Sequence, residues 1–182
     1  MAGIGAIASD GTSFYLTPWS GNANDLIYRY SLTGTFLGTI DATPSTGSIP
    51  SIWPGRTGLE VVGNTLVANQ GNNAGPYDQF SLNGTLLTAA FLGSPAAGFG
   101  LTGVTFDGTY YYAFDQEAVP SWLDVFDKNG NFVRTLTLNG LGGPNDIAPI
   151  EDLSAVVTTP EPTSLAVLTI GLAGLGFIRR RV

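Results

Sequence analysis

The chain of 182 residues contains no cysteine and no histidine, and only 12% of its residues are charged. Without cysteine it has no disulfide bond, thiolate nucleophile, iron–sulfur cluster or zinc–thiolate site. Without histidine it has no serine–histidine–aspartate triad, no histidine-type zinc site and no imidazole acid–base catalyst. The two absences exclude whole classes of hydrolytic and metal-dependent chemistry.

What the chain does contain is glycine, proline and hydrophobic residues. There are 25 glycines and 11 prolines, and 43% of the residues are hydrophobic. Disordered chains are poor in hydrophobic residues and rich in charge, so disorder is not expected. The many glycines and prolines exclude a coiled coil. A formal charge of −7 opposes binding to a phosphate backbone, and we therefore expect no nucleic-acid partner.

The C-terminal end of the sequence carries three features in order. Pro160, Glu161 and Pro162 come first, and two prolines so close together favour an extended segment. An uncharged apolar run over residues 165–178 follows. Its hydrophobic residues include Leu165, Ala166, Val167, Leu168, Ile170, Leu172, Leu175, Phe177 and Ile178. Arg179, Arg180 and Arg181 then stand directly before the last residue.

The apolar run predicts a helix that inserts into a membrane. Such a helix spans roughly 21 Å, which is short for a hydrocarbon core of about 30 Å. Neighbouring residues extend it, and the arginines reach toward the far headgroups. A buried core helix is the alternative that length alone favours, but an apolar run ending in three arginines has no element to pack on. We expect the arginines in the cytoplasm and residues 1–162 outside it.

A Pro-Glu-Pro segment, an apolar helix and a terminal arginine cluster resemble the PEP-CTERM sorting signal of exported bacterial proteins. The resemblance covers residues 160–182 and implies export by a Gram-negative bacterium that makes extracellular polysaccharide. It also implies processing by an exosortase, a membrane enzyme that cleaves near the motif. By this resemblance Pro160, Glu161 and Pro162 are the recognition element, the apolar run is the transient anchor, and Arg179–Arg181 are the cytoplasmic stop signal. These residues are then the substrate of another enzyme, and none is catalytic.

The beginning of the sequence lacks the other signal that export requires. It reads MAGIGA, without a basic residue, so no signal peptide is recognisable. Two explanations stay open: export by another route, or a sequence that lacks its true beginning.

Residues 1–157 contain an internal repeat. The segment Ser31–Thr35 recurs as Ser81–Thr85 and, more loosely, as Asp127–Asn131. The aligned glycines are Gly34, Gly84 and Gly130, and an aromatic residue stands four positions before each of them. A glycine between two apolar runs is typical of a hairpin turn, where it supplies a positive φ.

A second motif recurs in phase with the first. Residues 7–12 match residues 104–109, residues 61–65 form a weaker copy, and a second apolar strand follows each. Each unit therefore predicts four strands in about 40–50 residues, which is typical of a propeller blade. The predicted units span about residues 4–41, 58–92 and 101–138. A flat β-sandwich is the alternative, but it does not require so regular a period.

A fourth unit begins at residue 145 and supplies two strands, at 145–150 and 153–157, before the tail. Three and a half blades do not close a ring, which usually takes 4–8 blades. We expect an all-β partial propeller at residues 1–157, as the C-terminal part of a longer propeller, and a sorting and anchor segment at 158–182. The repeats resemble those of NHL, YncE-like and gluconolactonase-like propellers.

Acidic residues are the main titratable side chains. Asp10 and Asp107 precede glycines, and turn chemistry accounts for them. Asp115, Glu117 and Asp124 flank the third variable loop and are candidate Ca²⁺ ligands, although their spacing does not match an EF-hand.

A second candidate metal site comes from Glu60, Asn145 and Asp146, which open strands of the innermost type. Propellers of the lactonase type place metal ligands of these kinds in a central channel. The alternative role is a strand-end cap or a solvated rim.

The three tryptophans, Trp19, Trp53 and Trp122, lie in or beside loops. We expect them to be buried between blades, and stacking on sugar rings is the alternative.

The sequence as a whole predicts an exported binding module that needs no cofactor, no metal and no catalytic residue. Its expected partners are an exosortase, the membrane through the C-terminal helix, and a polysaccharide or an envelope protein. Two alternatives stay open: a metal-dependent propeller hydrolase of the lactonase type, and a tail-anchored β protein without a sorting step.

Overall fold

The computed structural model describes residues 3–19, 25–49, 55–71, 76–93, 101–115 and 121–138. The chain divides into two compact units, residues 1–149 and 150–182, and every described residue belongs to the first. The strands predicted at 145–157, the boundary predicted after residue 157 and the predicted helix lie outside the described residues. Within the described ranges, no helix has the length and hydropathy to cross a membrane.

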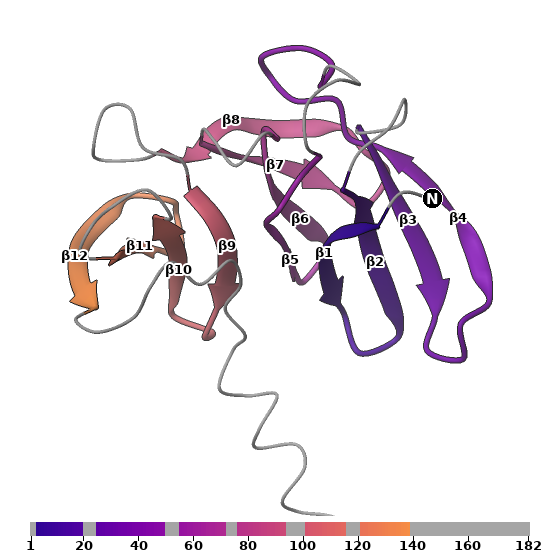
Figure 1. Ribbon diagram of the computed structural model, residues 1–182, viewed down its shortest axis with the longest axis horizontal. Helices are drawn as coiled ribbons and strands as arrows, with labels where there is room; N and C mark the ends of the chain where they lie inside the picture. The colour runs from indigo at the N-terminus through magenta and orange to yellow at the C-terminus, as the bar shows by residue number, and fades with distance from the viewer. Residues whose placement is uncertain are drawn as a thin grey trace, which may run out of the picture. The chain divides into compact units, whose positions relative to one another are not determined.

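The described residues form three separate four-stranded sheets, which we call sheets 1, 2 and 3 (Figure 1). In each, the strands follow one another in chain order and pair antiparallel. Sheet 1 contains β1 (Ile4–Ser9), β2 (Ser13–Pro18), β3 (Leu26–Ser31) and β4 (Phe36–Asp41). Sheet 2 contains β5 (Leu59–Val62), β6 (Thr65–Asn69), β7 (Tyr77–Ser81) and β8 (Leu86–Leu92). Sheet 3 contains β9 (Leu101–Phe106), β10 (Tyr110–Asp115), β11 (Ser121–Asp127) and β12 (Phe132–Leu138).

These sheets confirm the three predicted units, and the alternative of a flat β-sandwich is wrong. The reason lies in local turn chemistry. Gly34, Gly84 and Gly130 have φ values of 83°, 89° and 82°, which favour glycine over any other residue. The side-chain oxygen of the residue three positions before each glycine accepts a hydrogen bond from the backbone amide of the residue that follows the glycine. Thr35 donates to Ser31 (3.0 Å), Thr85 to Ser81 (3.1 Å) and Asn131 to Asp127 (2.9 Å).

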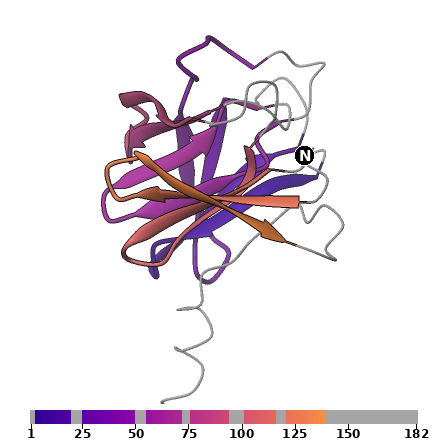
Figure 2. The same ribbon diagram turned by 90° about the vertical axis from the view of Figure 1, so that its left-hand side faces the viewer.

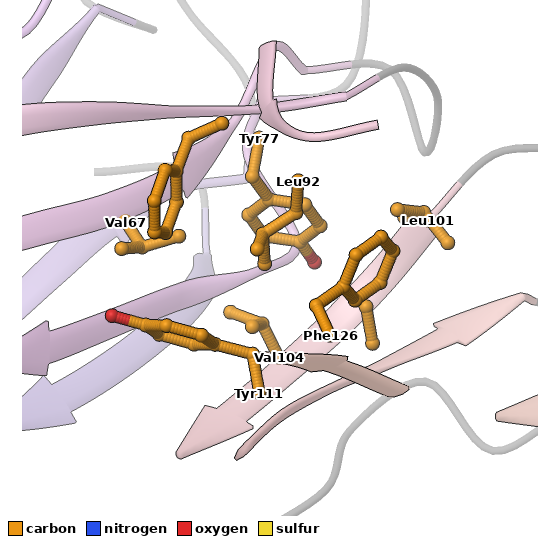
Figure 3. Packing of buried hydrophobic residues seen from close by; sticks show 9 residues of the cluster. Val67, Tyr77, Leu92, Leu101, Val104, Tyr111 and Phe126 are labelled. Atoms are coloured by element: carbon orange, nitrogen blue, oxygen red, sulfur yellow. The ribbon is translucent and has the colours of Figure 1, made fainter. Parts of the chain in front are cut away.

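The core consists of two apolar clusters, one on each face of sheet 2. Between sheets 1 and 2 lie Tyr15, Ile27, Ile40, Ala42, Leu59, Leu66, Ala68 and Phe80. Between sheets 2 and 3 lie Val67, Tyr77, Phe91, Leu92, Leu101, Val104, Tyr111, Ala113 and Phe126. Figure 3 shows the second cluster, with side chains from the two sheets pointing toward one another. Alternation along β6 and β7 therefore supplies side chains to both interfaces, whereas β5 contributes to the first cluster and β8 to the second.

Neighbouring sheets also meet at their first strands. β1 contacts β5, and β5 contacts β9, so the first strands lie side by side in chain order. Figure 2, in which sheet 3 faces the viewer, shows this sheet lying over sheet 2. Sheets that pack face to face and meet at their first strands are arranged as successive blades of a propeller.

The glycine turns add a third contact between neighbouring sheets. A Cβ atom at Gly84 would overlap the carbonyl oxygen of Asp41 in sheet 1, and one at Gly130 would overlap that of Phe91 in sheet 2. The β3–β4 type of turn therefore rests on the last strand of the preceding sheet. Gly34 has nothing within 4 Å of the same position.

Candidate functional site

The connections of the three sheets lie along two edges of different character. Short turns join the first strand to the second and the third to the fourth, and antiparallel order places them all along one edge, the turn edge. Longer connections reach the opposite edge, the loop edge, whose described residues include 19, 25, 42–49, 55–58 and 70–71 (Figure 1). Long loops on a rigid scaffold are where binding residues concentrate.

On the turn edge, Asp10 organises the connection between β1 and β2. Its Oδ1 accepts the amides of Thr12 and Ser13 and the Thr12 hydroxyl, each at 2.7 Å. Its Oδ2 accepts the Tyr15 hydroxyl at 2.8 Å. Partial burial acts to raise the pKa of Asp10, but these hydrogen bonds outweigh it and lower the pKa to about 2.

Asp107 repeats this arrangement in sheet 3. It accepts the amides of Thr109 and Tyr110 and the hydroxyl of Tyr112, each at 2.7 Å, and its pKa is also lowered. The predicted turn role of both aspartates is confirmed. Their tyrosine partners were missed, although the sequence places a tyrosine five residues after each aspartate.

At the loop edge, a completely buried Arg56 joins sheets 1 and 2. Its Nε donates to the carbonyl of Asn69 at 2.8 Å and one terminal nitrogen to that of Asp25 at 3.1 Å. The other terminal nitrogen donates to the carbonyl of Ala42. The guanidinium carbon also lies 5.7 Å from the ring centroid of Phe80. These partners occupy the guanidinium and make it a structural clamp.

Arg56 keeps its charge in this place. Burial lowers its pKa to about 10, while the nearby carboxylates of Asp25, Asp78 and Asp41 act in the opposite direction. Sequence reasoning missed this residue. One signal was present in the sequence. Leu59 and Val104 are equivalent in the first strands of sheets 2 and 3, and three residues before them stand Arg56 and Leu101, so a charged residue occupies a position that is apolar in the other repeat.

The buried Asp78 holds the segment after sheet 1 in place. Its carboxylate accepts the Ser45 amide (2.7 Å) and hydroxyl (3.0 Å), the Gln70 side chain (3.1 Å) and the Ala90 amide (2.8 Å). These bonds satisfy both oxygens of the carboxylate and order the described part of the loop edge.

Asp124, a candidate Ca²⁺ ligand, occupies the repeat position of Asp78 and is likewise buried. Its Oδ1 accepts the Thr135 hydroxyl at 2.6 Å, and its Oδ2 has no hydrogen-bond partner among the described residues. Burial raises its pKa, and the bond from Thr135 acts the other way. Glu117 and the side chain of Asp115 lie outside the described residues, within which no three acidic side chains gather to hold a metal.

Glu60, the other candidate metal ligand, lies in β5. Its Oε1 accepts the amide of Val61 at 3.0 Å. Burial, with a contribution from the Glu60 carboxylate, raises the pKa of Tyr111 in the next sheet to about 12. Asn145 and Asp146 lie outside the described residues, so a central metal site stays a prediction.

The expectation that the tryptophans are buried is wrong for Trp19, which is 41% exposed. It follows the last residue of β2 directly and so stands at the loop edge, where its carbonyl accepts the amide of Gly55 while its side chain stays exposed. Trp122 is half-buried in β11, and Trp53 lies outside the described residues.

Residues 158–181 match the PEP-CTERM protein-sorting motif. The predicted sorting signal is thereby confirmed, and the motif implies an exported protein that an exosortase processes and that associates with the envelope. A comparison with curated proteins gives no match.

Two solved structures show what the body is similar to. One is a nidogen/laminin complex, with 18% identity and a TM-score of 0.56 over 79% of this chain and 51% of that chain. The other is glutaminyl cyclase from Myxococcus xanthus, with 18% identity and a TM-score of 0.51 over 86% of this chain and 58% of that one. Both are propeller-like, which agrees with the fold, and this chain spans little more than half of each.

We expect Arg56→Met to lower the free energy of unfolding by about 3 kcal/mol, because it removes the Arg56 donors from the carbonyls of the buried residues Asn69 and Ala42 and breaks a third bond, to Asp25. Arg29→Met is the control. Arg29 also donates to one partner, Ser13, at 3.1 Å and lies over the Tyr15 ring, but it is only half-buried. The control is expected to cost less than about 1 kcal/mol. Urea unfolding followed by tryptophan fluorescence measures both, and equal losses would contradict the clamp.

The lowered pKa of Asp10 predicts a defined dependence of stability on pH. Its hydrogen bonds stabilise the fold fully above the unfolded value of about 4, and this contribution is lost as pH falls through about 2. Asp10→Asn is therefore expected to be less stable than the wild type at pH 6 and to approach it below pH 2. Unfolding midpoints at several pH values measure the difference, and a gap that does not change with pH would refute the prediction.

Proposed function

We propose that this chain is an exported, non-enzymatic binding module, which an exosortase releases from its membrane anchor into the cell envelope or extracellular matrix. The observation that carries the proposal is the PEP-CTERM motif at residues 158–181, which follows a body of repeated blades. In this proposal Pro160–Pro162 are recognised, Leu165–Ile178 hold the precursor in the membrane, and Arg179–Arg181 stay on the cytoplasmic side.

The use of polar groups in the body supports a binding role over catalysis. Charged side chains that could otherwise take part in catalysis, such as Arg56, Asp78 and Asp10, form hydrogen bonds within the protein that stabilise its fold. The fold itself does not decide the matter, because one similar structure comes from a complex with laminin and the other is an enzyme.

The loop edge is the surface that we propose for binding. Arg56 and Asp78 order its described residues from within, so that a ligand meets a largely preformed surface. Trp19 stands exposed there and offers an apolar ring with a polar N–H, which suits stacking on a sugar ring. A chain with formal charge −7 favours a ligand that is neutral or positively charged. We therefore propose an extracellular polysaccharide of the host as the ligand.

Processing is tested in the host by Glu161→Ala. We expect the wild-type protein to lose its arginine-containing C-terminus, and the variant to keep it in the membrane fraction, because the recognition element is altered. Glu151→Ala, an equal change ten residues upstream, serves as the control and is expected to be processed normally. Mass spectrometry of the C-terminal peptide distinguishes the forms. An intact C-terminus on the mature wild-type protein would refute processing.

Binding is tested by Trp19→Ala in a co-sedimentation assay with polysaccharide from the host. We expect a loss of affinity of up to about tenfold, because an aromatic stacking contact typically contributes about 0.5–1.5 kcal/mol and tenfold corresponds to about 1.4 kcal/mol. Phe132→Ala is the matched control, because Phe132 is 45% exposed but begins β12 beside the turn edge. Equal losses in both variants, or none in either, would argue against the loop edge.

A further inference from the structure

Two turns on the turn edge contain the same pair of residues, an asparagine followed by a glycine. Asn83 and Gly84 lie between β7 and β8, and Asn129 and Gly130 lie between β11 and β12. Both asparagines are exposed. A further pair of this kind, at residues 139 and 140, lies outside the described residues.

The backbone of the two turns is nearly identical. Gly84 and Gly130 have φ values of 89° and 82°. The amide of Gly84 donates to the carbonyl of Ser81 at 3.0 Å, and the amide of Gly130 donates to the carbonyl of Asp127 at 2.9 Å. The two glycine nitrogens are therefore equally engaged, and a difference in reactivity between the two asparagines has to come from side chains.

An asparagine that precedes a glycine can react with its own backbone, because glycine has no Cβ atom to obstruct the approach. The amide nitrogen of the glycine loses its proton and forms a bond to the side-chain carbon Cγ of the asparagine. The bond between Cγ and Nδ2 breaks, ammonia leaves with that proton, and a five-membered succinimide ring results. Water then opens the ring at either of its carbonyls, which gives aspartate or isoaspartate. The net reaction consumes one water, releases one ammonia and needs no enzyme.

Ring closure requires the asparagine side chain to rotate about its Cα–Cβ bond, since a nearly flat ring is incompatible with a staggered rotamer. At Asn83 three hydrogen bonds oppose this rotation. Its Oδ1 accepts the amide and the hydroxyl of Thr85, at 3.2 Å and 2.9 Å, and also the hydroxyl of Ser81. The carboxamide of Asn83 is therefore held on the turn by residues on both sides of it.

At Asn129 the residue equivalent to Ser81 is Asp127, and it forms its hydrogen bonds elsewhere. Its carboxylate accepts the backbone amides of Asn129 (2.8 Å) and Asn131 (2.9 Å) and the side-chain amide of Asn131 (2.9 Å). A carboxylate has no proton to donate to the Oδ1 of Asn129. Within the described ranges the carboxamide of Asn129 has no hydrogen-bond partner, so no such bond opposes its rotation.

We propose that Asn129 is a site of spontaneous deamidation in the folded protein and that its hydrogen bonds protect Asn83 from the same reaction. The product adds a negative charge two residues from Asp127, and its isoaspartate form lengthens the backbone of the turn by one carbon atom. Gly130 lies against the carbonyl of Phe91 in β8, so the longer turn disturbs the contact between sheets 2 and 3. This inference goes beyond the proposed function and does not depend on it.

The test is the rate of deamidation at each asparagine of the full chain, kept folded in detergent micelles at mildly alkaline pH and sampled over weeks. Digestion with pepsin at acid pH limits further reaction, and mass spectrometry with fragmentation locates the change in mass. We expect Asn129 to react at least about tenfold faster than Asn83, the factor that corresponds to about one or two ordinary hydrogen bonds. In urea, where the turns are lost, the two rates are expected to be similar.

Ser81→Ala and Thr85→Val each remove one hydroxyl donor to Asn83. We expect each to speed the reaction of Asn83 by about threefold to tenfold. Ser31→Ala is the matched control, because Ser31 accepts the same kind of bond in the equivalent turn of sheet 1, where neither asparagine lies. The rate of Asn129 in the same sample corrects for any general loss of stability.

Equal rates at Asn83 and Asn129 in the folded protein would overturn the proposal. It is also wrong if Asn129 stays unchanged in the folded chain while it reacts in urea, or if neither Ser81→Ala nor Thr85→Val speeds the reaction of Asn83. Ion exchange separates the deamidated chain, which is expected to unfold at a lower urea concentration than the unmodified chain. An unchanged midpoint would contradict the effect on the contact between sheets 2 and 3.

Discussion

A four-stranded sheet with apolar side chains on both faces does not bury them alone, and the rest of this structure follows from that constraint. Sheet 2 satisfies it on both faces, with one cluster around Phe80 facing sheet 1 and another around Tyr77 facing sheet 3. Each blade is stable because its neighbours remove its surface from water.

The few buried charged side chains stabilise the packing of these sheets. Burying an ion without partners is costly, and Arg56 is buried only because three carbonyls from two sheets receive its donors. Asp78 is satisfied in the same way by donors from the loop edge. Arg56 and Asp78 together order the described residues of the segment between the first two sheets. The loop edge is therefore a preformed surface, and the polar groups of these two side chains are already hydrogen-bonded within the protein.

The repeat could be predicted closely because turns are local. Gly34, Gly84 and Gly130 each require a positive φ within a few residues of sequence, and the strand limits follow from them. Arg56 and Trp19 could not be placed in the same way. Whether a residue between strands is buried depends on which distant segment lies over it, and their neighbours in sequence carry no such information. The sorting motif, by contrast, is linear and could be identified from the order of its residues.

The sequence by itself therefore determined the address and the building unit: a PEP-CTERM tail, three four-stranded repeats and a body without cysteine or histidine chemistry. These depend on residues close together in the chain. Only the tertiary structure decided which faces of those units are covered, where Arg56 finds its acceptors and which edge presents Trp19. The physical reason is that identical repeats differ in burial through their neighbours in space, and Ile7 and Val104 are alike in sequence but opposite in exposure.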